Sequence, residues 1–136
     1  MRRAVIALPV IALLAGGCGA AGETQESRFT GDQAEVAQVV DNLAAAGRAR
    51  DARTICADIL APQLLRDIRA ADGDCVSEMD RAIRDASDFD LQVVKVDVNG
   101  TTATATVRQG EDAKNTATFT FVKDRGEWRA TALGTS

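Results

Sequence analysis

Residues 91–108 read LQVVKVDVNGTTATATVR, a segment in which apolar and polar side chains alternate on both sides of Asn99-Gly100. Alternation with period two is typical of a strand that is buried on one face, and Asn-Gly is a preferred pair for a type I′ hairpin turn. A two-residue loop would place residues of one face opposite each other: Val98 with Thr101, Val96 with Ala103, and Val94 with Ala105. We therefore expect an antiparallel hairpin with one apolar face.

Two further strands are expected downstream, over residues 115–123 (NTATFTFVK) and 127–133 (EWRATAL), after a polar connection at 108–115. Asp124, Arg125 and Gly126 separate these strands. A three-residue loop with Gly126 in the left-handed conformation would set Lys123 opposite Glu127, and we favour it. A two-residue loop would instead set Lys123 opposite Trp128. Either loop completes a meander of four antiparallel strands.

The residues before the meander follow the helical period. Apolar side chains recur at spacings of three and four in the expected first helix, 32–46: Val36, Val39, Val40 and Leu43. Further helices are expected over 51–60, from Pro62 to Gly73, and over 75–86 with Asp74 as its cap. Gly47 is expected to stop the first helix, and its start could carry a capping box, Thr30 with Gln33 or Asp32 with Glu35. Helices followed by an antiparallel sheet predict an α+β fold.

The chain starts with a short basic segment, Met1-Arg2-Arg3, and an apolar run from Ala4 to Ala15. The run is too short to span a bilayer as a helix and is typical of a secretory signal peptide. The segment Ala15-Gly16-Gly17-Cys18 resembles the lipobox of bacterial lipoproteins, although that family usually has Leu where Ala15 stands. The resemblance implies a diacylglyceryl-modified Cys18 as the first mature residue. The alternative is an ordinary signal peptide that leaves Cys18 as a free thiol.

This interpretation divides the chain into a signal peptide (1–17), a lipidated cysteine with a flexible tether (18–31), and one α+β domain (32–136). Of three cysteines, lipidation of Cys18 leaves Cys56 and Cys75, which both lie on apolar helical stripes. We expect these two to form a structural disulfide, as suits an oxidising compartment. Two buried free thiols or a redox pair are the alternatives, and no C-x-x-C motif supports redox chemistry.

Composition narrows the possible functions. The chain has no histidine and no tyrosine, and its net charge is −4. It therefore lacks a Ser-His-Asp or Cys-His nucleophile pair, and an acidic chain with few aromatic residues is a poor match for nucleic acid. The acids Asp88, Asp90 and Asp97 are the candidate general bases, with solvated turn and strand charges as the simpler interpretation. We expect no cofactor.

Three other groups of residues have an ordinary structural interpretation beside a functional one. Asp72, Asp74 and Glu78 could suggest a cation site but lack the spacing of an EF-hand loop, so no metal site is expected. Arg48, Arg50 and Arg53 suit the dipole at a helix end, or could contact anionic lipid. Alternate threonines could form a ligand wall, but the solvated side of a sheet is the favoured interpretation: Thr102, Thr104, Thr106, Thr116, Thr118 and Thr120.

The order of elements, the Cys56-type helix cysteine and the closing VKDRGEW hairpin resemble small secreted and lipid-anchored domains of the nuclear transport factor 2-like, or SnoaL-like, superfamily of actinobacteria. That resemblance implies helices on the concave side of a curved four-stranded sheet, with a cone-shaped pocket. A cystatin-like helix-on-sheet fold is the alternative. Catalytic members of the superfamily use a pocket Asp, His or Tyr, and two of these residue types are absent here, so no catalytic residue carries over.

These observations predict a lipid-anchored domain on the extracytoplasmic face of the cell membrane. Its partners would be the membrane, through Cys18, and a small apolar ligand or an envelope protein. It could also serve as a structural subunit of an envelope complex. The alternative function is a SnoaL-like isomerase or dehydratase that uses a pocket Asp as its general base.

Overall fold

The computed structural model describes residues 28–86, 89–112 and 114–135, and the predicted signal peptide, Cys18 and most of the tether lie outside these ranges. The elements follow the order α1 (Asp32–Arg48), α2 (Ala52–Thr54), η2 (Ile55–Ile59), α3 (Pro62–Ala70), α4 (Cys75–Asp85), β1 (Leu91–Asn99), β2 (Thr102–Gln109), β3 (Thr116–Asp124) and β4 (Glu127–Thr135). The strands form one antiparallel sheet in the order β1-β2-β3-β4. The expected α+β class and the four-stranded meander are confirmed.

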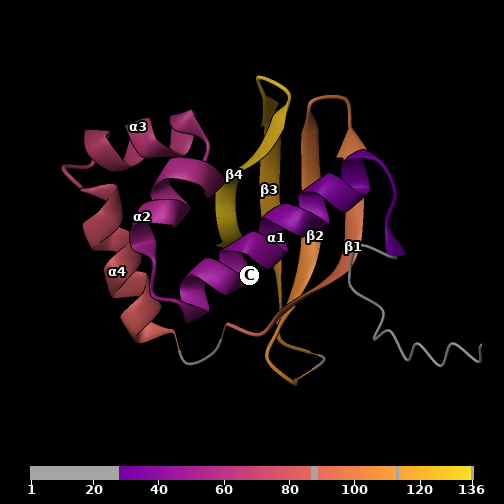
Figure 1. The fold of residues 1–136 in the computed structure, drawn as a ribbon, viewed down its shortest axis with the longest axis horizontal. Coiled ribbons are helices and arrows are strands. Elements are labelled where there is room, and N and C mark those ends of the chain that lie inside the picture. Colours follow the sequence, from indigo (N-terminus) through magenta and orange to yellow (C-terminus); the bar gives the residue numbers. More distant parts are fainter. Residues whose placement is uncertain (1–27, 87–88, 113, 136) are drawn as a thin grey trace, which may run out of the picture.

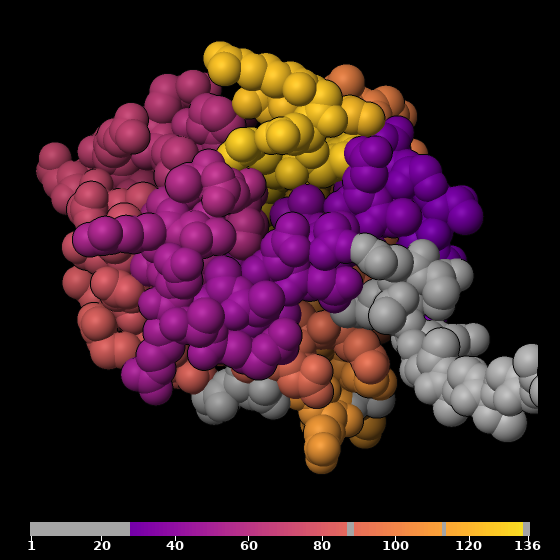
Figure 2. All heavy atoms as spheres, in the orientation of Figure 1, coloured from indigo at the N-terminus to yellow at the C-terminus, as the bar shows by residue number. Residues whose placement is uncertain are grey.

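Helix α1 lies across one face of the sheet, and the shorter helices gather beside β4 (Figure 1). In the space-filling view, α1 and α2 cover the middle of that face, and strand atoms emerge above and below them (Figure 2). The core forms between α1 and the inward side chains of the strands, among them Val36, Val40, Val96, Ala105, Val107, Phe119 and Phe121. Phe29, which the sequence analysis assigned to the tether, also packs against this core.

The β1–β2 hairpin differs from the expected register. Val98 pairs with Ala103 and Val96 with Ala105, so the loop is Gly100-Thr101 rather than Asn99-Gly100. Gly100 alone in this loop has a positive φ, 61°, as in a type II′ turn, so Asn99 stays extended and pairs with Thr102. The register shift is two residues, which keeps Val96, Val98, Ala103 and Ala105 on their expected face.

A β-bulge in β1 overturns the placement of Val94. The bulge lies between Val93 and Lys95, so Val93 pairs with Val107 and is buried. Val94 is displaced from the apolar face and is 58% exposed. A bulge adds one residue to one strand of the pair, and this extra residue shifts the alternation from that point on.

The β3–β4 hairpin has the two-residue loop, so the expected three-residue loop is wrong. Asp124 pairs with Glu127, and Lys123 lies opposite Trp128. Arg125 and Gly126 have φ values of 53° and 83°, the two positive values of a type I′ turn. Lys123 therefore shares the inner face with Trp128. This position is favourable for the ammonium group because the carboxylates of Asp32 and Glu35 in α1 bind it.

The helix ends agree only in part with expectation. Asp74 caps α4, since its carboxylate accepts hydrogen bonds from the Ser77 N–H and hydroxyl, both at 3.0 Å, and Pro62 opens α3. The N-cap of α1 is Gly31, with no side-chain capping bond, so neither predicted capping box forms. The helix also passes Gly47 and ends at Arg48.

The predicted second helix, 51–60, is mostly a π-helical turn. Only Ala52–Thr54 is α-helical, and the Leu60 N–H donates to the Ile55 carbonyl at 3.0 Å. Leu60 then forms a parallel bridge to Ala130, and the Ala61 N–H donates to the Ala130 carbonyl at 2.8 Å. This contact holds the short helices against the β4 edge of the sheet.

Candidate functional site: an apolar cavity between helix α4 and the sheet

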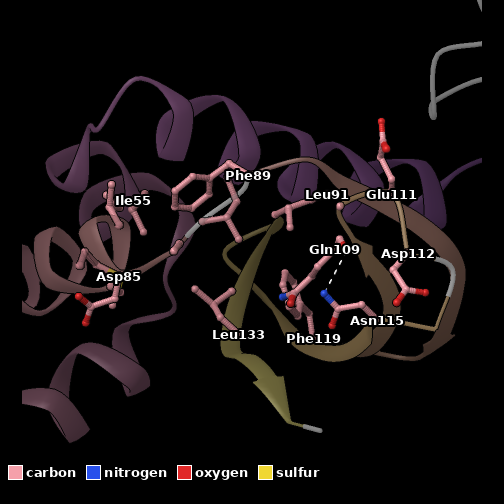
Figure 3. A pocket seen from close by; sticks show the side chains of 16 residues that line it. Ile55, Asp85, Phe89, Leu91, Gln109, Glu111, Asp112, Asn115, Phe119 and Leu133 are labelled. Atoms are coloured by element: carbon pink, nitrogen blue, oxygen red, sulfur yellow. Dashed lines mark hydrogen bonds between the residues drawn. The ribbon is translucent and has the colours of Figure 1, made fainter.

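A cavity of about 490 Å³ lies where α4 faces one end of the sheet. Its volume is within the range of about 300–1,000 Å³ that is usual for small-molecule sites. Figure 3 shows side chains from the helices and from the strands converging on it. The apolar part of the lining comprises Leu43, Ile55, Met79, Ala82, Ile83, Ala86, Phe89, Leu91, Phe119 and Leu133. With Gln109 of β2, which also lines the cavity, the site draws on α1, η2, α4 and all four strands.

Phe89 forms a wall of this cavity and lies directly against Gly47 of α1. A β-carbon at position 47 would lie 2.2 Å from Cδ1 of the Phe89 ring, so no larger residue fits there. The Arg48 guanidinium donates a hydrogen bond to the Phe89 carbonyl at 3.0 Å. Gly47 thus permits a close packing contact, and it does not end the helix as the sequence analysis expected.

The polar part of the lining comes mainly from the β2–β3 connection. The side-chain amide of Asn115 donates to the backbone carbonyl of Gln109 at 3.1 Å (Figure 3). The backbone N–H of Gln109 donates to the backbone carbonyl of Asn115 at 2.8 Å. These bonds hold the base of the connection closed. Three exposed acids, Asp85, Glu111 and Asp112, complete the lining, which contains no basic side chain.

Gln109 is the polar residue of this site that the sequence analysis missed. It follows Ala103, Ala105 and Val107 at period two, so it occupies an inward position of β2 opposite Leu91. Its side chain extends into the cavity beside Phe119 (Figure 3). Within the described part of the chain, its carboxamide has no hydrogen-bond partner. The sequence could have indicated this residue, because Gln109 is a polar side chain that follows three apolar residues at alternate positions of the same strand.

The predicted cysteine pair lies beside the cavity. The sulfur atoms of Cys56 and Cys75 are 1.97 Å apart, a disulfide distance, and their Cα atoms are 6.1 Å apart. Cys56 belongs to η2, directly after the lining residue Ile55, and Cys75 is the first residue of α4. The pair therefore joins two of the helical segments that line the cavity.

The candidate general bases do not come together at this site. Asp90 and Asp97 are exposed, and neither lines the cavity. Asp97 forms an ion pair with Lys95 at 3.0 Å. Asp88 lies outside the described residues. Across residues 28–86, 89–112 and 114–135, no charged side chain is buried.

The other residue groups named from the sequence have structural partners. Asp74 caps α4, and the hydrogen bonds from Ser77 lower the pKa of its carboxyl group. Glu78 pairs with Arg81 at 3.4 Å. Within the described ranges, no three Cys, Asp or Glu side chains form a cluster that could hold a metal ion.

The remaining arginines and the threonines occupy solvated positions. Arg50 and Arg53 are exposed. The predicted threonine face is exposed or half-buried throughout: Thr102, Thr104, Thr106, Thr116, Thr118 and Thr120. Within it, Thr104 pairs with Thr120 and Thr106 with Thr118 across β2 and β3. This placement agrees with the solvated side of a sheet rather than a ligand wall.

A second polar cluster lies away from the cavity and ties α1 to the β3–β4 hairpin. The Lys123 ammonium lies 2.7 Å from Oδ1 of Asp32 and 3.8 Å from Oε2 of Glu35. The indole N–H of Trp128 also donates to Asp32, at 3.2 Å. The hydrogen bond from Lys123, and then the one from Trp128, lower the pKa of Asp32, and the same bond to Asp32 raises the pKa of Lys123.

A larger hollow, of about 630 Å³, lies beside this cluster between α1 and β4, but most of the residues that line it are polar or charged. Its apolar lining residues are Ala34, Val39, Gly126 and the buried Trp128, and the other lining residues are polar or charged: Glu35, Gln38, Asn42, Asp58, Glu127 and Arg129. The cavity beside α4 is therefore the better candidate for a small apolar molecule.

No helix in the described ranges is long and apolar enough to cross a membrane.

Comparison with known proteins adds no further information on the site. No family model matches this chain, and neither the curated proteins nor the solved structures contain a significant match.

Proposed function

We propose that this protein is a lipid-anchored extracytoplasmic domain that binds a small apolar ligand in the cavity between α4 and the sheet. The cavity itself carries the proposal, because it combines about 490 Å³ of space with a mostly apolar lining and a few polar groups at one side. Sites of this composition are the usual hosts of small molecules. A nuclear transport factor 2-like cone is the proposed fold family, supported by helices on one face of a four-stranded sheet.

Binding is favoured over the isomerase or dehydratase alternative. A pocket Asp acts as a general base when burial raises its pKa toward neutrality. Among the residues that the structure describes, the acids in the cavity lining are all exposed. An envelope protein is the alternative partner, and no surface of the described residues favours it.

The ligand test uses a neutral apolar probe, N-phenyl-1-naphthylamine, whose fluorescence rises in apolar surroundings. We expect the full chain carrying Cys18→Ser to bind this probe. Ala82 is an exposed alanine that lines the cavity. The Ala82→Phe substitution should lower the affinity about ten-fold, since overfilling an apolar site costs about 1–3 kcal/mol.

The matched control for this test is Ala45→Phe. Ala45 is also an exposed helical alanine, but it does not line the cavity. Its affinity for the probe should equal that of the parent chain. If the parent does not bind the probe, or if both phenylalanine variants bind it equally, the proposed site is wrong.

The anchoring part of the proposal rests on the lipobox at Ala15-Gly16-Gly17-Cys18. Two or three acyl chains give stable anchoring because each buried CH₂ contributes about 0.8 kcal/mol. In cells, Cys18→Ser should move the protein from the membrane fraction to the soluble fraction. The double variant Cys56→Ser/Cys75→Ser should stay with the membrane. Retention of the Cys18→Ser protein at the membrane would contradict lipid anchoring.

A further inference from the structure

We infer that the cavity selects apolar molecules with a cationic, hydrogen-bond-donating head group, with Gln109 as the polar anchor for that group. This inference rests on the proposed function and names the class of ligand that the site would take. It combines two observations: the charge of the lining, and the one inward-facing carboxamide without a partner in the described part of the chain.

The charge of the lining is of one sign. Asp85 lies on α4, whereas Glu111 and Asp112 lie on the β2–β3 connection, so acids from two separate segments border the same cavity (Figure 3). The Arg48 guanidinium donates to the Phe89 carbonyl, and Lys114 precedes Asn115 in the chain, but neither Arg48 nor Lys114 is part of the lining. An anionic head group such as a carboxylate would meet repulsion here, and an ammonium group would meet attraction.

The acids are free to act on a ligand because little within the fold neutralises them. No ion pair joins Asp85, Glu111 or Asp112 to a cation in the described ranges. The Asp112 carboxylate accepts a hydrogen bond from the Lys114 backbone N–H at 2.9 Å, which orients it without removing its charge. Each acid is exposed, so each contributes a modest, salt-dependent attraction.

Gln109 supplies the directional contact. Its carboxamide is half-buried among apolar side chains, and the acidic residues Glu111 and Asp112 follow it closely in the chain. A polar group in such surroundings is stabilised when it gains a hydrogen-bond partner. The carboxamide oxygen can accept from an ammonium or hydroxyl group. The apolar tail would then lie against Phe89, Phe119 and Leu133.

The test compares three probes with the same ten-carbon tail and different heads: decylammonium, decanol and decanoate, each below its micellar concentration. Titration calorimetry of the full chain carrying Cys18→Ser should show decylammonium binding about five-fold more tightly than decanol, as a few exposed ion pairs provide. Decanoate should bind most weakly. The preference should shrink as salt is added.

Neutralising the rim should abolish the preference. The triple variant Asp85→Asn/Glu111→Gln/Asp112→Asn is expected to bind decylammonium and decanol with equal affinity. Its control, Asp58→Asn/Asp97→Asn/Glu127→Gln, removes the same charge from exposed acids outside this cavity. If the control loses the preference equally, net charge rather than the rim is responsible, and the inference fails.

The role of Gln109 is tested by two substitutions, one expected to weaken ligand binding and the other to strengthen it. Gln109→Leu should weaken decanol binding about three- to ten-fold, the range that one hydrogen bond provides. Gln109→Glu should strengthen decylammonium binding. Unchanged decanol binding by Gln109→Leu would remove the anchor role.

The outcomes separate this inference from the proposed function. Equal affinities for the three probes, or tightest binding of decanoate, would overturn the ligand class and leave the apolar cavity as a binding site. Binding of none of the probes, together with no binding of the naphthylamine, would overturn both.

Discussion

The absence of a side chain at position 47 allows Phe89 to lie against α1. Gly47 is buried in the last turn of α1, where its helix propensity is still lower than that of alanine. The contact explains its presence, because a β-carbon would lie 2.2 Å from the Phe89 ring. One residue thus determines the position of a wall of the cavity.

Replacement of Gly47 by alanine is therefore expected to destabilise the protein, despite the better helix propensity of alanine. We expect a loss of about 1–3 kcal/mol from steric overlap, measured by urea unfolding. Naphthylamine binding should weaken as well, since Phe89 lines the cavity. In a Phe89→Leu background the loss should shrink. An equal loss in both backgrounds would mean that the ring is not the cause.

Asp32 contributes to stability in a pH-dependent way. Hydrogen bonds from Lys123 and Trp128 hold its folded-state pKa below the ordinary 3.8. A group whose pKa is lowered by folding stabilises the protein above its unfolded-state pKa, and this contribution disappears as the pH falls through the folded-state pKa. The stability from Asp32 is therefore present at neutral pH and disappears below about pH 4.

The Asp32→Asn substitution should remove this part of the acid sensitivity. The unfolding free energy of the parent chain should fall more between pH 6 and pH 3 than that of the variant, as urea titrations at each pH would show. Lys123→Met should have a similar effect because it removes the main partner of Asp32. A parent and variant with parallel pH curves would contradict this assignment.

At the scale of the element, the two hairpins show how a turn sets register. In the β3–β4 loop, Arg125 adopts a φ of 53°, a left-handed conformation that is unfavourable for a long side chain, beside Gly126 at 83°. Asparagine tolerates this conformation well, and Asn-Gly is the preferred pair for the same turn. The hairpin therefore keeps a suboptimal residue at an exposed position.

Arg125→Asn should stabilise the protein by about 0.5–1 kcal/mol, because it relieves the left-handed strain without changing the fold. Gly126→Ala should destabilise it by about 1–2 kcal/mol for the opposite reason. Thermal unfolding of both variants provides the check. A lower melting temperature for Arg125→Asn would mean that the arginine side chain contributes a contact that outweighs its strain.

At the scale of the whole molecule, a few long-range links join the layers in addition to the hydrophobic core between them. The Lys123–Asp32 pair joins the hairpin to the start of α1, the Leu60–Ala130 bridge joins the short helices to the sheet, and the Cys56–Cys75 pair joins η2 to α4. Helix α4 packs mainly on α2, η2 and α3 rather than on the strands. The cysteine pair is thus a principal support for the helical side of the cavity.

Removal of the disulfide should weaken both the fold and the site. The cysteines are 19 residues apart, and closing a loop of this size stabilises the folded state by about 3 kcal/mol in the chain-entropy model. Urea unfolding of Cys56→Ser/Cys75→Ser should show a loss of this order, and its naphthylamine affinity should fall. Oxidised and reduced parent chains with equal stability would show that the pair contributes nothing.

Local patterns in the sequence were sufficient for the class of the fold but not for the shape of the site. Residues 32–46 and 91–108 carried periods of 3.6 and two, which depend only on near neighbours, and both produced the expected elements. The Asp74 cap and Pro62 start were predictable for the same reason. The cavity was not, because Ile55, Phe89 and Leu133 meet only after the chain has folded.

The sequence by itself determined α1, α3, α4, the four strands and their order, because these follow from local backbone preferences and the alternation of apolar residues. Register was decided by tertiary structure. In β1–β2 a shift of two residues keeps the same faces, so alternation cannot detect it. In β3–β4 the loop places Lys123 inward, against its polarity, because Asp32 lies 91 residues earlier in the chain and supplies the partner that makes this burial favourable.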